Sequence, residues 1–253
     1  MPLFSNEKIE EFIYHKELLS TNAHAIGQVN KQESNTNVVY YTFKQSEGRG
    51  QIGKSWYSGS GKNLAFSLSM PLKACYVSWG SYLNLWVANT IRSFIQIKLP
   101  NHKIEVKWPN YIYVGKTKIC GLLIQCVVQA KFIKHIVIGV GINVNEDQFP
   151  KDLPNPSSIR LASQKEYQLI PLLQELIEHI ELQIPSFSFS NFEEILALYH
   201  KHLYLKDHKH RFIDAKKNQK FEAIIRSVDG SGAIHLETAN GIRAYKFREI
   251  QYE

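Results

Sequence analysis

A glycine-rich stretch between two short apolar runs places the strongest constraint on how this chain folds. It covers residues 45–67, and the flanking residues 38–43 and 64–68 have the β-branched, aromatic and leucine-rich composition of strands. A long loop without apolar periodicity is unusual inside a compact domain and is usually functional. Its glycines let the backbone approach a ligand closely, and Arg49 and Lys54 add positive charge. The stretch therefore predicts a loop that binds an anion, most simply a phosphate.

Length and composition describe a globular chain. Its 253 residues, of which 44% are hydrophobic, can hold one large domain or one domain with a small appendage. No window approaches about eighteen uncharged apolar residues, and no basic segment followed by an apolar one marks a secretion signal, so we expect neither a membrane span nor export. Cys75, Cys120 and Cys126 are odd in number and match no zinc spacing. They predict reduced thiols in a cytoplasmic protein.

The charge of the chain is basic but dispersed. Lysine and arginine number 30 against 23 aspartates and glutamates, a formal net charge of +7. Such a balance suits nucleic acid, acidic proteins or small anions. No helix-turn-helix, zinc-finger or basic-zipper pattern accompanies the positive residues, so we do not expect DNA as a partner. The histidines lack acidic partners in register, and we predict no metal-ligating set.

Apolar periodicity predicts helices and strands in the same domain. Residues 117–128 and 131–145 have the composition of two long strands joined by a tight hairpin. Amphipathic helices are expected within residues 173–184 and 192–203. A further helix should end before Pro100, and its apolar face consists of Leu83, Trp86, Val87, Thr90, Ile91, Phe94 and Ile95.

The composition changes at about residue 206. From there short strands alternate with turn dipeptides, which are Asp229-Gly230, Ser231-Gly232 and Asn240-Gly241. This pattern predicts a small β-barrel. We therefore divide the chain into a larger domain, residues 1–205, and a small C-terminal domain, residues 206–253.

Two short polar motifs each allow two interpretations. Ser20-Thr21-Asn22 either caps a helix or binds a ligand, because all three side chains can satisfy free backbone N–H groups. Gly139 and Gly141, at the end of a buried strand, either let two backbones pack closely or form a wall against a ligand.

Lys118 is an unusual residue in its strand. By simple alternation it shares a face with Cys120, Leu122 and Ile124, so it begins a face that is otherwise apolar. A lysine in that place lies at the mouth of a pocket or extends its ammonium out of the core.

Residues 48–53 match the dinucleotide-binding pattern G-x-G-x-x-G, but their context excludes it. That motif needs a helix directly after the glycines and an acidic residue about twenty positions further on. Here a second glycine-rich segment and a strand follow, and residues 67–73 contain no acid. Residues 59–62 suggest a P-loop but lack its first glycine and its final Ser or Thr.

Taken together, five motifs resemble those of biotin protein ligases over essentially the whole chain. They are S-T-N at 20–22, Q-x-x-G-R-G-x-x-G-x-x-W at 45–56, K-W-P-N at 107–110 with Lys118 eight residues later, G-L-L-I at 121–124 and G-V-G-I-N at 139–143. The resemblance implies an α+β fold: a mixed or antiparallel sheet flanked by helices, as in class II synthetases, with a C-terminal SH3-like β-barrel. It also implies no DNA-binding winged helix, because the sequence ahead of the first strand is short. Both a monomer and a homodimer fit these features.

The resemblance implies a two-step reaction. Biotin is activated by Mg²⁺-ATP to biotinoyl-AMP, and the acyl group then passes to a lysine of a biotin carboxyl carrier domain. The first step brings a carboxylate against a phosphate, a repulsion of about 4 kcal/mol at ~4 Å and an effective dielectric constant of ~20. Fixed cations must offset it, and Arg49 and Lys118 are the expected catalytic residues.

Matching motif positions supply the remaining expected site residues. Biotin would be bound by Ser20, Thr21, Asn22, Gln45, Gly48, Arg49, Gly50, Gln51, Lys118, Gly121, Gly139 and Gly141. ATP would be bound by Arg49, Trp56, Lys107, Asn110, Lys118 and Asn143. The glycine-rich loop is expected to close over biotin and the adenylate together.

Three residues depart from the family pattern. Tyr111 replaces an aspartate after K-W-P-N, Gln51 replaces a frequent arginine, and Gln125 replaces a glutamate. We expect activity to persist with an altered dependence on ATP or Mg²⁺. The alternatives are a biotin-binding relative with impaired catalysis and a lipoate or octanoyl transferase.

Overall fold

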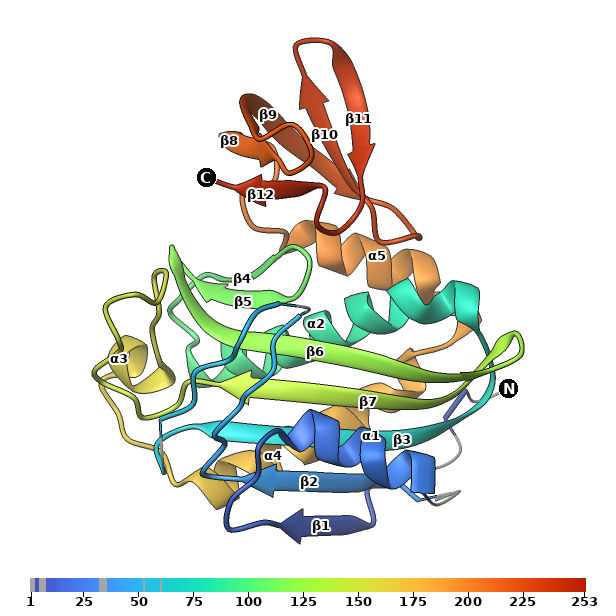
Figure 1. Cartoon of the computed structure of the whole chain (residues 1–253), viewed down its shortest axis with the longest axis vertical. Coiled ribbons are helices and arrows are strands. Elements are labelled where there is room, and N and C mark those ends of the chain that lie inside the picture. Colours follow the sequence, from blue (N-terminus) through green and yellow to red (C-terminus); the bar gives the residue numbers. More distant parts are fainter. Residues whose placement is uncertain (1–2, 5–7, 32–35, 52, 60) are drawn as a thin grey trace.

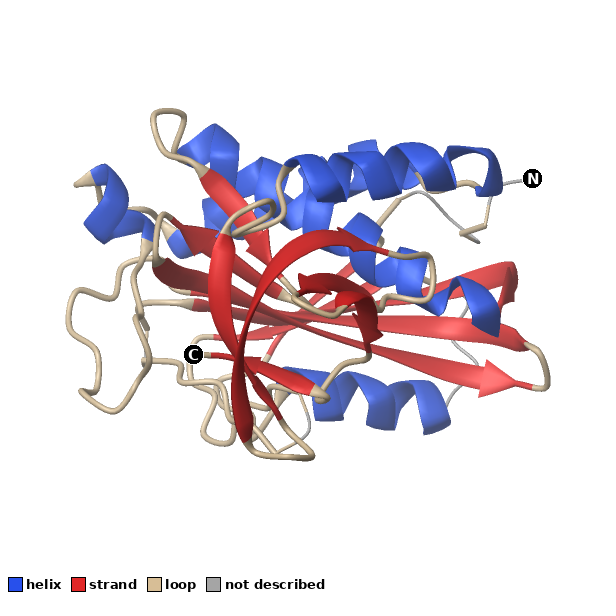
Figure 2. Ribbon diagram, turned by 90° about the horizontal axis from the view of Figure 1, so that it is seen from above, coloured by secondary structure: helices blue, strands red, loops and turns tan. Residues whose placement is uncertain are grey.

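Two sheets and their helices make up the fold. The computed structural model describes residues 3–4, 8–31, 36–51, 53–59 and 61–253. A seven-stranded mixed sheet has helices on both faces, as Figure 2 shows, and a five-stranded sheet from the C-terminal residues lies above it in Figure 1. The predicted α+β class, with a mixed sheet flanked by helices, is confirmed. Within the described ranges no helix is long and apolar enough to cross a membrane.

The large sheet is antiparallel except at one edge, where its first two strands run parallel. In spatial order its strands are β1 (Glu11–Tyr14), β2 (Val38–Thr42), β3 (Leu64–Tyr76), β7 (Phe132–Ile142), β6 (Thr117–Gln129), β5 (Tyr111–Val114) and β4 (Ile104–Lys107). The long pair β6–β7 is the hairpin that the sequence predicts, and its turn residue Ala130 has a positive φ of 54°. This hairpin crosses the centre of the sheet and later forms the floor of the site.

The helices divide unequally between the two faces (Figure 2). Helices α2 (Gly80–Lys98), α4 (Leu169–Gln183) and α5 (Phe192–Lys201) pack together on one face, and α1 (Thr21–Lys31) lies on the other. The short α3 (Ile159–Ser163) follows β7. Helix α2 ends two residues before Pro100, and its predicted apolar face is buried, so that prediction is confirmed.

The two faces also differ in their cores. The large hydrophobic core lies on the side of α2, α4 and α5, whereas α1 covers a small cluster formed by Ala25, Val38, Tyr40 and Val137. Alternation along β7 then places Gly139 and Gly141 on the same side as Val137, beyond the end of that cluster. Helix α1 does not cover this part of the sheet, and residues of other segments lie over it.

The C-terminal residues form the predicted antiparallel strands. These are β8 (Lys209–Asp214), β9 (Gln219–Val228), β10 (Ile234–Thr238), β11 (Gly241–Tyr245) and β12 (Ile250–Tyr252), in the order β11-β10-β9-β8-β12. The pairing of these strands is an open series, so closure into an SH3-like barrel stays a prediction. The Asn240-Gly241 turn joins β10 and β11 as expected, with Gly241 at a φ of 96°.

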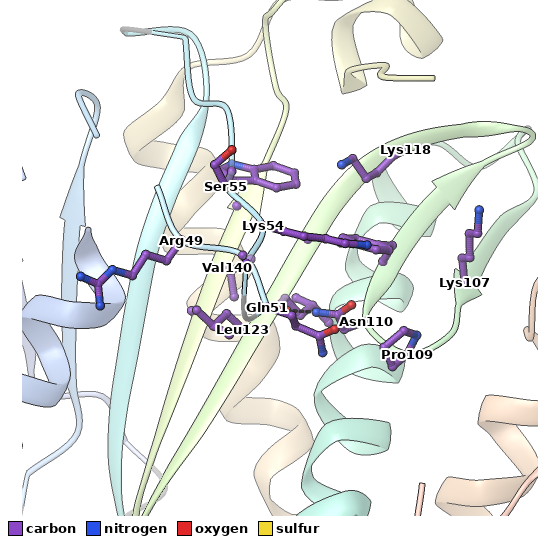
Figure 3. Close-up of a pocket in the computed structure, with 18 of the residues that line it drawn as sticks. Arg49, Gln51, Lys54, Ser55, Lys107, Pro109, Asn110, Lys118, Leu123 and Val140 are labelled. Atoms are coloured by element: carbon purple, nitrogen blue, oxygen red, sulfur yellow. Dashed lines mark hydrogen bonds between the residues drawn. The ribbon is translucent and has the colours of Figure 1, made fainter. Parts of the chain in front are cut away.

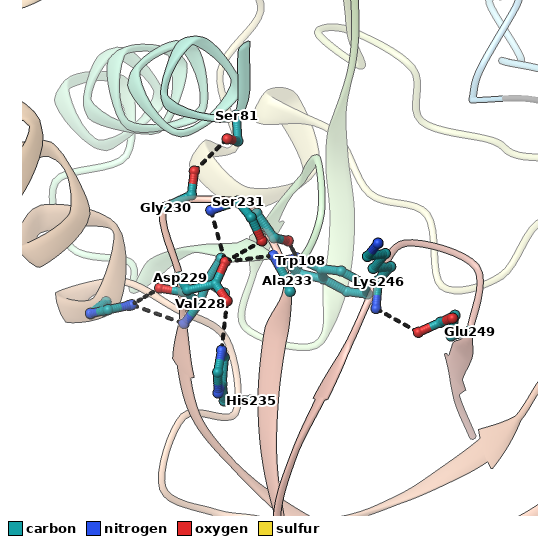
Figure 4. Close-up of polar contacts among 12 residues, drawn as sticks. Ser81, Trp108, Val228, Asp229, Gly230, Ser231, Ala233, His235, Lys246 and Glu249 are labelled. Atoms are coloured by element: carbon teal, nitrogen blue, oxygen red, sulfur yellow. Dashed lines mark hydrogen bonds and ion pairs between the residues drawn. The ribbon is translucent and has the colours of Figure 1, made fainter. Parts of the chain in front are cut away.

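The turn between β9 and β10 attaches the small sheet to the large one (Figure 4). Asp229 shapes this turn, because its carboxylate accepts hydrogen bonds from the Ser231 amide at 2.8 Å and from the His235 ring at 2.8 Å. The Ser81 hydroxyl of α2 donates to the carbonyl of Gly230, and the turn also accepts a bond from the Trp108 indole. Both sheets share the large hydrophobic core. The boundary at residues 205 and 206 stays a prediction.

Candidate active site

A cavity of about 510 Å³ opens on the face of the large sheet that carries α1, in the part that this helix does not cover. Strands β6 and β7 form its floor, and the glycine-rich loop and residues 107–110 lie around it (Figure 3). Residues of β12 also line it. All but two of the sequence-predicted site residues line it: Ser20, Thr21, Asn22, Gln45, Arg49, Gly50, Gln51, Trp56, Lys107, Asn110, Lys118, Gly121, Gly139 and Gly141. Ile52 and Ser60 of the predicted loop lie outside the described residues.

The floor contains three glycines of the β6–β7 pair. Gly121 pairs with Gly141, and Gly139 pairs with Leu123. A Cβ atom on Gly141 would lie 2.3 Å from Nε1 of Trp56, and one on Gly139 would lie 2.8 Å from the Asn22 carboxamide nitrogen. The glycines therefore make room for the side chains of Trp56 and Asn22 above the sheet, and both of these side chains line the cavity.

One end of the cavity is formed by the first turn of α1. The hydroxyl of Ser20 accepts a hydrogen bond from the Ala23 amide at 3.3 Å, so the predicted helix cap is present. The Thr21 amide donates to the Gln45 side-chain oxygen at 2.9 Å, and the Asn22 carboxamide donates to a backbone carbonyl of β6 at 3.2 Å. Ser20 therefore caps the helix and also lines the cavity. This end of the cavity presents neutral hydrogen-bond donors and acceptors.

The other end of the cavity is positively charged. Lys54 of the loop, Lys107 at the end of β4 and Lys118 of β6 line it there (Figure 3). Burial lowers the pKa of Lys118, and the charge of Lys54 lowers it further. Burial, followed by repulsion from Lys54 and Lys118, lowers the pKa of Lys107 to about 8. Ammonium groups that repel one another in this way form a site for a polyanion.

Lys118 lies on the opposite face from the one that alternation predicts. The register between β5 and β6 shifts, so that Ile112 pairs with Cys120 whereas Tyr113 pairs with Lys118. Ile119 is therefore an extra residue, a β-bulge, and it reverses the direction of the side chain before it. As a result the Lys118 ammonium lies 5.3 Å from the ring of Trp56 and 5.0 Å from that of Tyr111, above the floor.

Two predicted residues support the cavity without lining it. The Asn143 carboxamide donates to the carbonyl of Ser157 at 2.9 Å, so it fixes the segment after β7. Gly48 accepts a hydrogen bond from the Trp56 amide at 2.7 Å, and a Cβ there would lie 2.3 Å from the Trp56 carbonyl oxygen. Gly48 thus lets the two arms of the loop pack together.

Arg49 lines the cavity but does not join the lysines. Its side chain is exposed and extends away from Lys54 and Lys118 (Figure 3). The structure therefore brings Lys118 and Lys54 together at the positive end and leaves Arg49 at the rim. The predicted closure of the loop over its ligands stays a prediction.

Three residues at the positive end are absent from the biotin-binding and ATP-binding sets that the resemblance implies. Lys54 carried a usable signal, since it is a cation in the glycine-rich loop. No such sign was present in the sequence for Tyr113 and Tyr252, because they reach Lys107 from β5 and from β12.

Across the described residues, no group of three or more His, Cys, Asp or Glu side chains could hold a metal ion.

Comparisons with known proteins agree with this arrangement. Residues 15–143 match the Biotin/lipoate A/B protein ligase family. The bifunctional ligase/repressor BirA of Bacillus subtilis is 25% identical over 251 residues, which cover 96% of this chain and 74% of that protein. BirA of Salmonella typhimurium is 26% identical over 235 residues, with 91% and 71% coverage.

Solved structures share the fold at lower identity. The biotin protein ligase of Aquifex aeolicus in complex with biotin and ATP has a TM-score of 0.71 at 18% identity, covering 97% of this chain and 100% of that one. The ligase of Leishmania major in complex with biotinyl-5-AMP has a TM-score of 0.66 at 19% identity, covering 94% and 100%. The family model matches residues 15–143, which are more than half of this chain, so this chain belongs to the Biotin/lipoate A/B protein ligase family.

Proposed function

We propose that this protein is an ATP-dependent, AMP-forming biotin protein ligase. In the first step a carboxylate oxygen of biotin attacks the α-phosphorus of ATP, the bond to the bridging oxygen breaks, and pyrophosphate leaves. In the second step the neutral amine of a carrier-domain lysine attacks the acyl carbon, an amide forms, and AMP leaves. The similarity to the ligase/repressor BirA of Bacillus subtilis, which covers 96% of this chain, supports this reaction.

The observation that carries the proposal is the polarity of the cavity. Neutral hydrogen-bonding groups of Thr21, Asn22 and Gln45 lie at one end, and three lysines lie at the other, above one glycine floor. An uncharged ring system with a carboxylate, joined to a phosphate, fits this order of surfaces. Biotin would therefore lie toward α1, and its carboxylate would point to Lys118.

The lysines would do the electrostatic work of the first step. Two anions that approach to ~4 Å repel by about 4 kcal/mol at an effective dielectric constant of ~20. A cation fixed beside the reacting oxygens offsets that repulsion without reorganisation. Lys118 is fixed in this sense, since the Trp56 and Tyr111 rings lie on it. Lys54 adds a cation to the glycine-rich loop in which Gln51 supplies none.

Magnesium would reach this site together with the nucleotide. Mg²⁺ prefers oxygen ligands and is commonly held by substrate phosphates with one or two carboxylates. The described residues that line the cavity include amides, hydroxyls and cations but no carboxylate. The phosphates of the nucleotide would therefore supply most of the negative charge that the ion needs, which agrees with a tyrosine in place of an aspartate at position 111.

The test is biotin transfer by the purified protein. With biotin, Mg²⁺-ATP and a biotin carboxyl carrier domain, we expect pyrophosphate release and one labelled biotin on the carrier lysine. Lipoate and octanoate in the same assay should not replace biotin. Absence of biotin-dependent pyrophosphate release would refute the ligase assignment, and transfer of lipoate or octanoate instead would assign a related acyl transfer.

A further inference from the structure

Lys107 is enclosed by three tyrosine rings. Its ammonium lies 4.4 Å from the ring centroid of Tyr252, 4.9 Å from that of Tyr113 and 5.7 Å from that of Tyr204. It also donates to the Tyr113 hydroxyl at 3.4 Å. A cation within about 6 Å of an aromatic ring is attracted to its face, and the attraction grows when water is excluded. We call these three tyrosines the Lys107 cage.

The cage joins parts of the chain that are far apart in sequence. Tyr113 belongs to β5 of the large sheet, Tyr204 to the segment between α5 and β8, and Tyr252 to β12, the last strand of the small sheet. The hydroxyl oxygen of Tyr252 is buried and has no hydrogen-bond partner among the described residues. Its contribution to the cage is therefore made by its ring, and the small sheet reaches the positive end of the cavity through it.

Charged and titratable groups of several elements lie around Lys107. They are Lys54 of the loop, Lys118 of β6 and His210 of β8, in addition to the three tyrosines. The two lysines repel the Lys107 ammonium, and burial also disfavours its charge. The rings hold the ammonium in place but do not neutralise it, so an incoming polyphosphate finds a dehydrated cation at a fixed position.

We propose that Tyr252 is a positioning residue for biotin activation, because its ring completes the cage that holds the Lys107 ammonium against the ATP phosphates. The small C-terminal sheet would in this way take part in the first reaction step. The proposal rests on the proposed function, since it assigns the polyphosphate that Lys107 binds to ATP.

The experiment compares Tyr252→Phe, which keeps the ring, with Tyr252→Leu, which removes it. Tyr245→Leu, in the same small sheet but outside the cage, is the matched control for general loosening. Pyrophosphate release gives kcat and the KM values for ATP and biotin. We expect Tyr252→Leu to raise the KM for ATP about tenfold, as loss of a desolvated cation–π contact implies, while the KM for biotin stays unchanged. Tyr252→Phe and Tyr245→Leu should keep both values.

The pH profile provides a readout that general damage would not change. In the wild type, kcat/KM for ATP should fall as pH rises through the pKa of Lys107, about 8. Tyr252→Leu removes the ring contact and changes the burial of the ammonium, so the alkaline fall should move along the pH axis in this variant and keep its position in Tyr252→Phe. An unshifted profile, or an equal shift in Tyr245→Leu, would overturn the proposal.

A double-mutant cycle tests whether Tyr252 acts through Lys107. In a Lys107→Met background, Tyr252→Leu should no longer change the KM for ATP, and an undiminished effect would overturn the proposal. Tyr204→Leu removes another ring of the cage. If Tyr252→Leu fails to fold, Tyr204→Leu should show the same increase in the KM for ATP and the same change in the pH profile.

Calorimetric titration with inorganic tripolyphosphate separates this proposal from the proposed function, because it needs no catalysis. Binding to the wild type that weakens in Tyr252→Leu but not in Tyr252→Phe supports the cage, even if no biotin is activated. Equal binding by all three proteins would refute it.

Discussion

Replacing Lys118 by methionine tests the electrostatic reasoning most directly. The substitution removes the ammonium but keeps an unbranched side chain of similar length between the rings of Trp56 and Tyr111. The reacting carboxylate and phosphate repel by about 4 kcal/mol at ~4 Å and a dielectric constant of ~20. Loss of one preorganised charge-stabilising group typically costs about 2.7–4 kcal/mol, or 10²–10³ in rate. We expect Lys118→Met to lower kcat for biotin activation by that factor.

The assay is single-turnover formation of biotinoyl-AMP, which separates the first step from transfer to the carrier. Lys116→Met is the matched control, since Lys116 is an exposed residue of the turn between β5 and β6. Arg49→Met gives a second comparison, because Arg49 is exposed and directed away from the lysines. In this arrangement Arg49→Met should lower kcat for biotin activation less than Lys118→Met does. An equal loss of kcat would show that the loop moves when ligands bind.

Two results would refute this reasoning. Retention of more than about one-tenth of kcat by Lys118→Met would mean that its charge is not used in the transition state. An equal loss in Lys116→Met would mean that the total positive charge matters and not the position that the β-bulge gives to Lys118.

Three further substitutions follow from the same geometry. Gly141→Ala places a Cβ 2.3 Å from Nε1 of Trp56, so the ring must shift. We expect calorimetry to show at least tenfold weaker biotin binding, and an unchanged affinity would mean that the floor tolerates the methyl group. Gly27→Ala is its control, since a Cβ there meets nothing within 4 Å; thermal unfolding should show about 0.4–1 kcal/mol of added stability, and destabilisation would contradict an unstrained helical site. Tyr111→Asp places a carboxylate beside Lys118 and should lower the Mg²⁺ concentration needed for half-maximal turnover and raise kcat; an unchanged Mg²⁺ titration would show that Tyr111 does not set this dependence.

Local patterns in the sequence predicted most of the elements. The apolar face of α2 repeats at the helical period, and the helix ends before Pro100 because proline cannot continue it. The β6–β7 hairpin and the turns at Asp229-Gly230 and Asn240-Gly241 follow from alternation and from residues that accept turn conformations. These features depend on neighbours within a few positions, so they can be read without the fold.

The motifs also located the cavity, although they did not determine the orientation of its charged groups. Gly121, Gly139 and Gly141 meet on one floor as expected, whereas Asn143 turns toward Ser157. Arg49 was expected at the phosphate and lies at the rim. A motif gives the position of a residue along the chain, but the direction of a long side chain depends on all the segments around it.

By itself, the sequence determined the α+β class, most of the strands and helices that form it, and most of the residues that gather at the cavity. Only the tertiary structure decided how the charges meet. The bulge at Ile119 reverses the face of Lys118, and Tyr252 reaches Lys107 from the last strand of the small sheet. Register shifts and contacts between distant strands have no local signature, because they result from the energy of packing the whole sheet and not from the preferences of a few consecutive residues.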